Sequence, residues 1–382
     1  MTITNARRGL QRRIYMPTVA EGTYGEGDTT FTHAFNALRN DGEAIRTSVL
    51  TTTDEDFATG REFAQNQIHL GVDLPPRTFT LPLTTEALGL FGAFALGDDT
   101  KTTASGTTLH TLAMVSLAAG YPGSFGMEEH LGGATADSSQ DENLRGVVVD
   151  SITISGDREG LTRIAVTVSG NGGRGTAQTQ TESGLIIPAT YYPAAAIHWG
   201  IRATAAEHDP EDVSYTKPST SFTPATVTSG NGWTLLSPML STWSITYTNV
   251  WGVRRAPGTS TSAGLLGVCP TLARRTISAE ITFLQSAGYD TLTQALIGGT
   301  NANNVEYSLA CEAVSDEDLA TNLFAGWLIH LPVCGLADNP SGSFSDLNSD
   351  TATFIVKQSA GADAYNAMRI ITHDARDVTY NA

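Results

Sequence analysis

Cysteine is scarce in this chain of 382 residues, and long apolar runs are missing. The three cysteines, Cys269, Cys311 and Cys334, are odd in number and widely spaced. They predict buried thiols rather than a disulfide framework or a zinc site. No run approaches the roughly 18 apolar residues of a membrane span. The basic start around Arg12 and Arg13 leads into no hydrophobic region of a signal peptide. We therefore expect a chain that is made in a cytoplasm and spans no membrane.

Positive charge is the second scarcity. The formal net charge is −17, and lysine occurs only at Lys101, Lys217 and Lys357. Binding nucleic acid through its phosphates requires Lys and Arg. An acidic surface instead repels DNA over about one Debye length. The composition predicts a protein that does not hold nucleic acid, and it suits either a high-salt host or a GC-rich genome.

What the sequence does contain is a β pattern with short helices. Val149–Ser155 and Leu161–Val168 alternate between apolar and polar residues on either side of a polar turn, which predicts a β-hairpin. Trp243–Thr248 and Thr351–Val356 predict further strands. The fold class we expect is mainly β, with tryptophans in or beside strands as core residues.

Two short helices are expected at matching places. Thr84 or Thr85 can cap a helix that Gly97 ends, and Asp290–Ile297 offers the second helix. Each helix follows a similar strand that contains an Arg-Thr pair.

Those two strands, Pro76–Thr84 and Ala273–Thr282, are the clearest internal similarity. Their separation is far greater than the 20–50 residues of a solenoid repeat. The similarity extends to Gly146–Gly156 and Gly326–Gly335. It predicts a duplicated domain, and the chain divides into an N-terminal arm or loop (1–44), a first copy (45–170), a connector (171–237), a second copy (238–357) and a C-terminal tail (358–382).

Two motifs suggest chemistry and are better explained otherwise. Gly170–Gly175 fits the G-x-G-x-x-G pattern, but no helix opens on these glycines, so a flexible exit from the hairpin is favoured. Ser214–Lys217 spells S-x-x-K, but Pro218 disfavours the helical turn that this motif needs.

Metal ligands could be sought in two acidic segments, His208–Asp212 and Glu128–His130. Neither has a His-x-x-x-His or EF-hand spacing. Solvated acidic loops are the expected reading, with weak cation binding left open. We assign no catalytic, cofactor-binding or metal residue, and we expect that the chain is not an enzyme.

Three passages together resemble the tail tube (major tail) proteins of long-tailed viruses with flexible, non-contractile tails. The first runs from Arg77–Leu81 to Leu96-Gly97. The second runs from Leu109–Leu112 through Tyr121–Glu128 to Gly146–Ile154, and the third is Arg275–Thr282.

This resemblance implies a tube-forming β-sandwich flanked by a helix, whose strands form a continuous barrel in an assembled ring. Two fused copies imply a trimer with pseudo-sixfold symmetry, and a hexamer is the alternative. Implied partners are further copies of the chain, the terminator, tape measure and distal tail proteins, and genomic DNA in the lumen without specific binding. The implied location is the virion tail, assembled in the host cytoplasm.

Three regions are expected to make ring-to-ring contacts: residues 1–27, the loop 54–67, and the tail from Gln358. We also expect lumen-facing positions to carry Asp or Glu more often than Arg, so that DNA slides through. The competing hypothesis is a monomeric β-sandwich module that binds carbohydrate or acts as an adhesin on a virion or cell surface.

Overall fold

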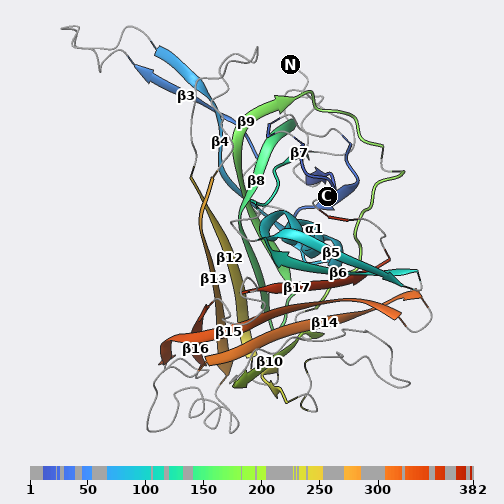
Figure 1. Ribbon diagram of the computed structural model, residues 1–382, viewed down its shortest axis with the longest axis vertical. Helices are drawn as coiled ribbons and strands as arrows, with labels where there is room; N and C mark the ends of the chain where they lie inside the picture. Colours follow the sequence, from blue (N-terminus) through green and yellow to red (C-terminus); the bar gives the residue numbers. More distant parts are fainter. Residues whose placement is uncertain are drawn as a thin grey trace, which may run out of the picture.

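The fold is known from a computed structural model (Figure 1). It describes residues 12–22, 24–25, 30–38, 45–53, 67–104, 106–115, 120–131, 141–181, 183–193, 196–203, 227, 229, 232–237, 240–252, 271–284, 306–320, 323–343, 349–357, 367–375 and 379–380.

We call β1 to β9 with α1 the first half, and β10 to β17 the second half. The first half contains β1 (Arg12–Met16), β2 (His33–Asn36), β3 (Ser48–Thr53), β4 (Gln67–Pro82), α1 (Thr85–Leu96), β5 (Gly97–Ala104), β6 (Thr107–Met114), β7 (Phe125–Leu131), β8 (Glu142–Asp157) and β9 (Arg163–Gly175). The second half contains β10 (His198–Ala203), β11 (Thr234–Leu235), β12 (Leu240–Gly252), β13 (Thr271–Leu284), β14 (Glu306–Ala320), β15 (Leu323–Ser343), β16 (Ser349–Val356) and β17 (Arg369–Asp374).

The main sheet is antiparallel and follows the order β3-β4-β9-β8-β12-β13-β16-β15. Its strands β4, β8, β9, β12 and β13 run along the long axis of the molecule (Figure 1). The two halves meet at the pairing of β8 with β12, which is regular from Ser151 opposite Thr248 to Asp157 opposite Thr242. Within the described residues this sheet does not close on itself, so the expectation of a mainly β fold is confirmed in this open form.

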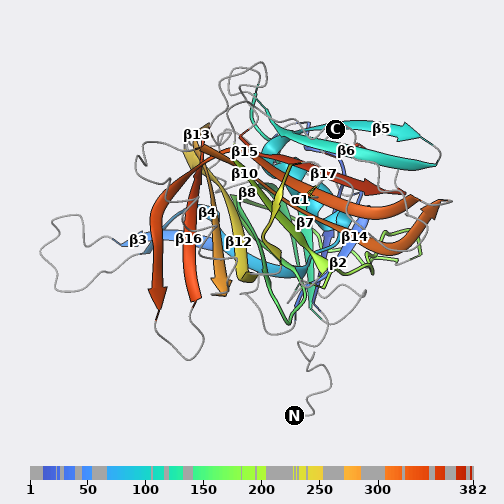
Figure 2. The ribbon, with the colours of Figure 1, turned by 90° about the horizontal axis from the view of Figure 1, so that it is seen from below.

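A second layer crosses the first. β15 continues out of the main sheet and pairs with β14 and β17, and the order of this layer is β5-β6-β17-β15-β14-β10-β11. Figure 2 shows the β5–β6 hairpin on the far side of β17 from β16 and β13. The two layers contact each other through the rings of Trp199 and Trp243, whose centroids lie 5.2 Å apart.

Helix α1 lies between the layers and is buried on almost every side. Thr84 caps it by accepting a hydrogen bond from the Ala87 amide at 3.1 Å, and Gly97 ends it at φ 102° in the left-handed region. Every residue of the helix except Glu86 is buried, as expected for a helix enclosed by sheets. The prediction of this helix is confirmed, whereas Asp290–Ile297 lies outside the described residues.

The strand ladders of the two halves match. Six antiparallel pairings of the first half, β1–β2, β1–β7, β3–β4, β4–β9, β7–β8 and β8–β9, have counterparts in β10–β11, β10–β14, β12–β13, β13–β16, β14–β15 and β15–β16. The counterparts follow the same order along the chain.

Predicted strands lie where expected. The hairpin of Val149–Ser155 and Leu161–Val168 is confirmed as part of β8 and β9, Trp243–Thr248 lies in β12, and Thr351–Val356 lies in β16. Trp327 on β15 is fully buried, as expected for a core tryptophan.

The two ends of the sequence also carry ordered strands. In the range predicted as an arm, β1 pairs with β2 and β7, and Ile14, Tyr15 and Met16 are fully buried. In the range predicted as a tail, β17 pairs with β6 and β15. The domain boundaries stay predictions.

Candidate functional surfaces

The outward face of the main sheet is lined by hydroxyl groups. Where the side chains are described, alternate residues along the central strands are buried, as Ile277, Ala279 and Ile281 are on β13. The positions between them point away from the core. One row crosses five adjacent strands and contains only Thr and Ser, namely Thr78, Thr167, Ser151, Thr248 and Thr276.

Neighbouring hydroxyls of this face bond to one another. The Oγ1 atoms of Thr78 and Thr167 are 2.8 Å apart, and those of Thr282 and Thr351 are 3.0 Å apart. At the junction of the halves, Thr153 and Thr246 are 3.2 Å apart. Each such pair is worth roughly 0.2–1 kcal/mol. Their more important property is that they satisfy polar groups without charge.

Charged side chains of both signs interrupt this face. Its described members include Asp150, Asp157, Glu280, Arg163 and Arg274. The described part of the face is therefore mixed and largely neutral, and the expectation of a predominantly acidic wall stays a prediction.

Asp150 is the most perturbed carboxyl of this face. Burial raises its pKa to about 6, although the Ser169 hydroxyl donates a hydrogen bond to it at 2.7 Å and acts in the opposite direction. The side chain can therefore change its charge near neutral pH.

A shallow hollow of about 310 Å³ lies at one end of the β8–β12 junction. Its lining includes Asp157, Arg163 and Glu280, together with the edge of Trp243. The indole fits there because position 156 is glycine, where a Cβ would lie 2.9 Å from the ring. Trp243 is only 5% exposed, so it offers little ring surface for stacking on a ligand.

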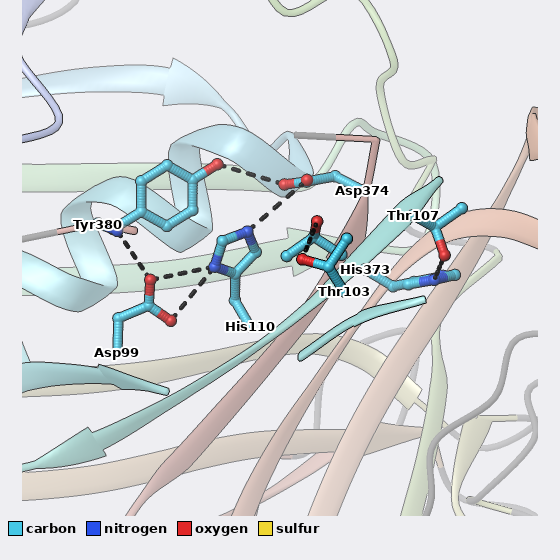
Figure 3. Close-up of polar contacts among 8 residues, drawn as sticks. Asp99, Thr103, Thr107, His110, His373, Asp374 and Tyr380 are labelled. Carbon is cyan, nitrogen blue, oxygen red and sulfur yellow. Dashed lines mark hydrogen bonds and ion pairs between the residues drawn. The ribbon is translucent and has the colours of Figure 1, made fainter. Parts of the chain in front are cut away.

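A histidine network is buried on the other side of α1 (Figure 3). The Nδ1 atom of His110 on β6 lies 3.0 Å from an Asp99 carboxylate oxygen, and its Nε2 atom lies 3.7 Å from an Asp374 oxygen. Tyr380 completes the group: its amide donates to Asp99 at 2.7 Å, its hydroxyl to Asp374 at 3.2 Å, and its ring stacks on His110.

The two carboxylates favour the protonated form of the imidazole. Burial alone lowers the pKa of His110, but the nearby carboxylates of Asp374 and Asp99 outweigh it and raise the pKa to about 9. The Nδ1 atom of His110 contacts Asp99 within hydrogen-bond distance, whereas its Nε2 atom is buried without a hydrogen-bond partner among the described residues and faces Asp374. In the part of the chain that is described, no group of three or more potential ligands is arranged to hold one. The His110 and Asp99 side chains are 0% exposed, so no substrate reaches them in this conformation.

The glycine motif of the sequence lies in a strand. Gly170–Gly175 is the last part of β9, where Gly172 takes φ 75° and a Cβ on Gly170 would lie 2.6 Å from the Gly146 carbonyl oxygen. These glycines let the strand pass close over β8. The prediction of a flexible exit is therefore wrong in its details, because the segment is a paired strand.

The acidic segment Glu128–His130 is buried in β7 rather than solvated. Glu128 accepts hydrogen bonds from His130 and from the Asn143 amide, and Glu129 pairs with Arg12. The Glu129–Arg12 pair fastens β7 to β1, and the Glu128–Asn143 bond fastens β7 to β8. The expectation of a solvated loop is wrong here, because six consecutive residues of β7 are buried and their charged side chains find partners inside the fold.

The structure describes only some of the other predicted residues. Cys311 and Cys334 are buried free thiols, and burial raises the pKa of each, which confirms that prediction for both. Cys269, Ser214–Lys217 and His208–Asp212 lie outside the described residues. The His110 network was missed from the sequence because its members come from β5, β6, β17 and the region of Tyr380.

No family model matches the chain, and no curated protein matches it. Among the described residues, no helix is long and apolar enough to cross a membrane.

Proposed function

We propose that this chain is a structural protein of a virion, a tail tube protein whose copies join edge to edge into rings that stack into a tube. The observation that carries the proposal is the β8–β12 junction between two halves with matching ladders. It is already an edge-to-edge contact between two similar units within one chain.

The ladders also agree in register, which supports a duplication. Ile164 on β9 lies between Leu81 and Ile154, and Phe354 on β16 lies between Ala279 and Leu336. Leu81 and Ala279 each stand four residues after the arginine of the repeated Arg-Thr pair. Two tube domains in one chain would let three chains complete a six-part ring.

Free strand edges support assembly. The edge of β8 from Ser151 to Asp157 is covered by β12, whereas residues 336–343 of β15, at the corresponding place in the second half, pair only with β16 among the described strands. Exposed edges are templates for pairing with another chain, and ring closure removes them. In this proposal a second copy covers β15 as β12 covers β8.

The outward face suits the wall of a channel. Thr and Ser hydroxyls provide hydrogen bonds to water, while phosphates are held mainly by clustered Lys and Arg. In its described part, this mixed and largely neutral face gives DNA no run of cations to bind. Genomic DNA would pass through without specific contacts, and the other partners would be tail proteins at the two ends of the tube.

A second candidate is a glycan-binding or adhesin module. The hollow beside Trp243, with Asp157, Arg163 and Glu280 in its lining, is the observation in its favour. It ranks second because the indole is nearly covered.

Negative-stain imaging with a mass measurement separates the two candidates. Rings or tubes of uniform bore built from three chains per ring support the first. Rings of six chains keep the tube and overturn the trimer. Dispersed monomers that bind a glycan array, and lose that binding in Glu280→Gln, support the module instead.

A further inference from the structure

One strand near the end of the sequence connects the two halves in a second place. β17 pairs with β6 from Arg369 opposite Ala113 to Asp374 opposite Thr108, and its other edge pairs with β15 from Arg369 opposite His330 to His373 opposite Gly326. The β5–β6 hairpin belongs to the first half, and β15 belongs to the second. Within the described ladders, β17 is what joins them.

The same segment is anchored through Tyr380. This side chain is 0% exposed and packs against α1 where Gly89 leaves room, since a Cβ at Gly89 would lie 2.8 Å from the tyrosine ring. Its amide and hydroxyl bond to the two carboxylates that flank His110. The anchor therefore depends on the same charges as the histidine (Figure 3).

Other charges of the described residues lie around this network. Lys101 stands opposite His110 in the β5–β6 ladder and is exposed, and Glu86 of α1 acts on Tyr380 from a distance. On the other face of β17, His373 contacts Thr107 and the Phe324 carbonyl, and burial lowers its pKa. The positive charge between the two carboxylates is thus that of His110.

We propose that β17 and Tyr380 form a strap that fastens the two halves together and is released when His110 loses its proton. With the imidazolium present, two buried carboxylates share one cation and are satisfied. Without it, two buried negative charges flank a neutral ring, which is strongly unfavourable. Release would free one edge of β6 and one edge of β15, and the halves could then move relative to each other about the β8–β12 junction.

The direction of the pH dependence follows from the raised pKa. A histidine whose pKa is higher in the folded protein stabilises it fully below the unfolded value of 6.5, and this contribution is lost as pH rises through about 9. The charge of His110 therefore keeps the strap closed at neutral and acidic pH, and the loss of this charge opens it at alkaline pH.

The test combines histidine NMR with trypsin cleavage of the full chain. The imidazole of His110 should titrate near pH 9. Cleavage after Arg369, which lies in the strap, should accelerate at least about tenfold between pH 8 and pH 10, the effect of losing one charge-assisted hydrogen bond. Cleavage after Arg158, in the exposed turn between β8 and β9, reports the protease's own pH response.

Variants locate the effect. His110→Gln should open the strap already at pH 8, whereas His198→Gln, a half-buried histidine on β10, should leave it closed. Since His110→Gln removes a buried charge and can prevent folding, Tyr380→Phe is the milder variant: it should speed cleavage after Arg369 at pH 8 and leave cleavage after Arg158 unchanged.

Two results would overturn the strap. One is a His110 titration near pH 6.5. The other is a ratio of Arg369 to Arg158 cleavage that stays constant between pH 8 and pH 10, with Tyr380→Phe without effect. Neither readout depends on ring assembly, so the strap and the proposed tube function can fail separately.

Discussion

In the first half of the chain, β9 runs without interruption from Arg163 to Gly175. It pairs with β8 over this whole length, from Arg163 opposite Ser155 to Gly175 opposite Asn143. The second half uses two separate strands for the corresponding places, because β16 pairs with one part of β15 and β17 with the other. In the first half, the glycine-rich end of β9 stays paired with β8. In the second half, the chain leaves β15 after β16 and pairs with it again as β17.

This difference indicates which strand can detach from the sheet by itself. If one part of a continuous strand such as β9 detaches, it stays tethered to the part that remains paired with β4 and β8. A separate strand such as β17 can leave alone, and it is the one that carries a buried charge network. The features the halves share build the sheet, and the features they do not share hold the halves together.

The strongest test of the shared part uses two counterpart core residues. Ile164 and Phe354 are each fully buried at the centre of matching ladders. We expect Ile164→Ala and Phe354→Ala each to lower the free energy of unfolding by about 2–5 kcal/mol. Chemical denaturation followed by tryptophan fluorescence and by circular dichroism measures this.

Both variants should shift one common transition, since the β8–β12 junction joins the halves. If each variant instead moves a different one of two transitions, the halves are independent units. The conservative changes Ile164→Val and Phe354→Leu are the matched controls and should cost less.

The glycine bend of β9 can be broken directly. A Cβ at Gly170 would press on the backbone of Gly146, so Gly170→Ala should cost about 1–3 kcal/mol. Gly22→Ala is the control, because nothing lies within 4 Å of a Cβ there. Equal melting temperatures for the two variants would show that the bend does not need glycine.

A smaller effect is expected on the outward face of the first half. The pKa of Asp150 is about 6 in the folded protein, above its usual 3.8, so the stability that its protonated form contributes is lost as pH rises through 6. Asp150→Asn should therefore stabilise the protein by roughly 1–2 kcal/mol at pH 8 and by little at pH 4.

Thermal unfolding at both pH values checks this, with Asp98→Asn on the exposed face of β5 as the control. A gain that is the same at pH 4 and pH 8 would mean that the effect comes from packing rather than from charge.

Local features of this fold could be predicted from the sequence, and distant ones could not. The hairpin around Asp157–Gly160 and the helix between Thr84 and Gly97 depend on neighbouring residues, so alternation and capping were sufficient. The match of Gly146–Gly156 with Gly326–Gly335 was displaced by about two residues, since Ile154 corresponds to Leu336 in the ladder. The glycines at the ends of these two segments suggest one alignment, whereas the hydrogen bonds of β8 and β15 with their neighbours set the actual register.

The candidate surfaces could not be predicted from the sequence. Thr153 and Thr246 meet only because β8 and β12 pair across the halves, and His110 meets Asp374 only through β17. Neither contact has a signal in local spacing, because its members come from distant parts of the chain.

The central claim is that copies of this chain join through their strand edges as the two halves join through β8 and β12. Electron cryomicroscopy of the purified full-length protein tests it most directly. The account predicts a ring of three chains in which residues 336–343 of β15 pair with a neighbouring copy and the Thr and Ser rows line the bore. A ring in which this edge stays free, or a bore lined by arginine, would contradict it.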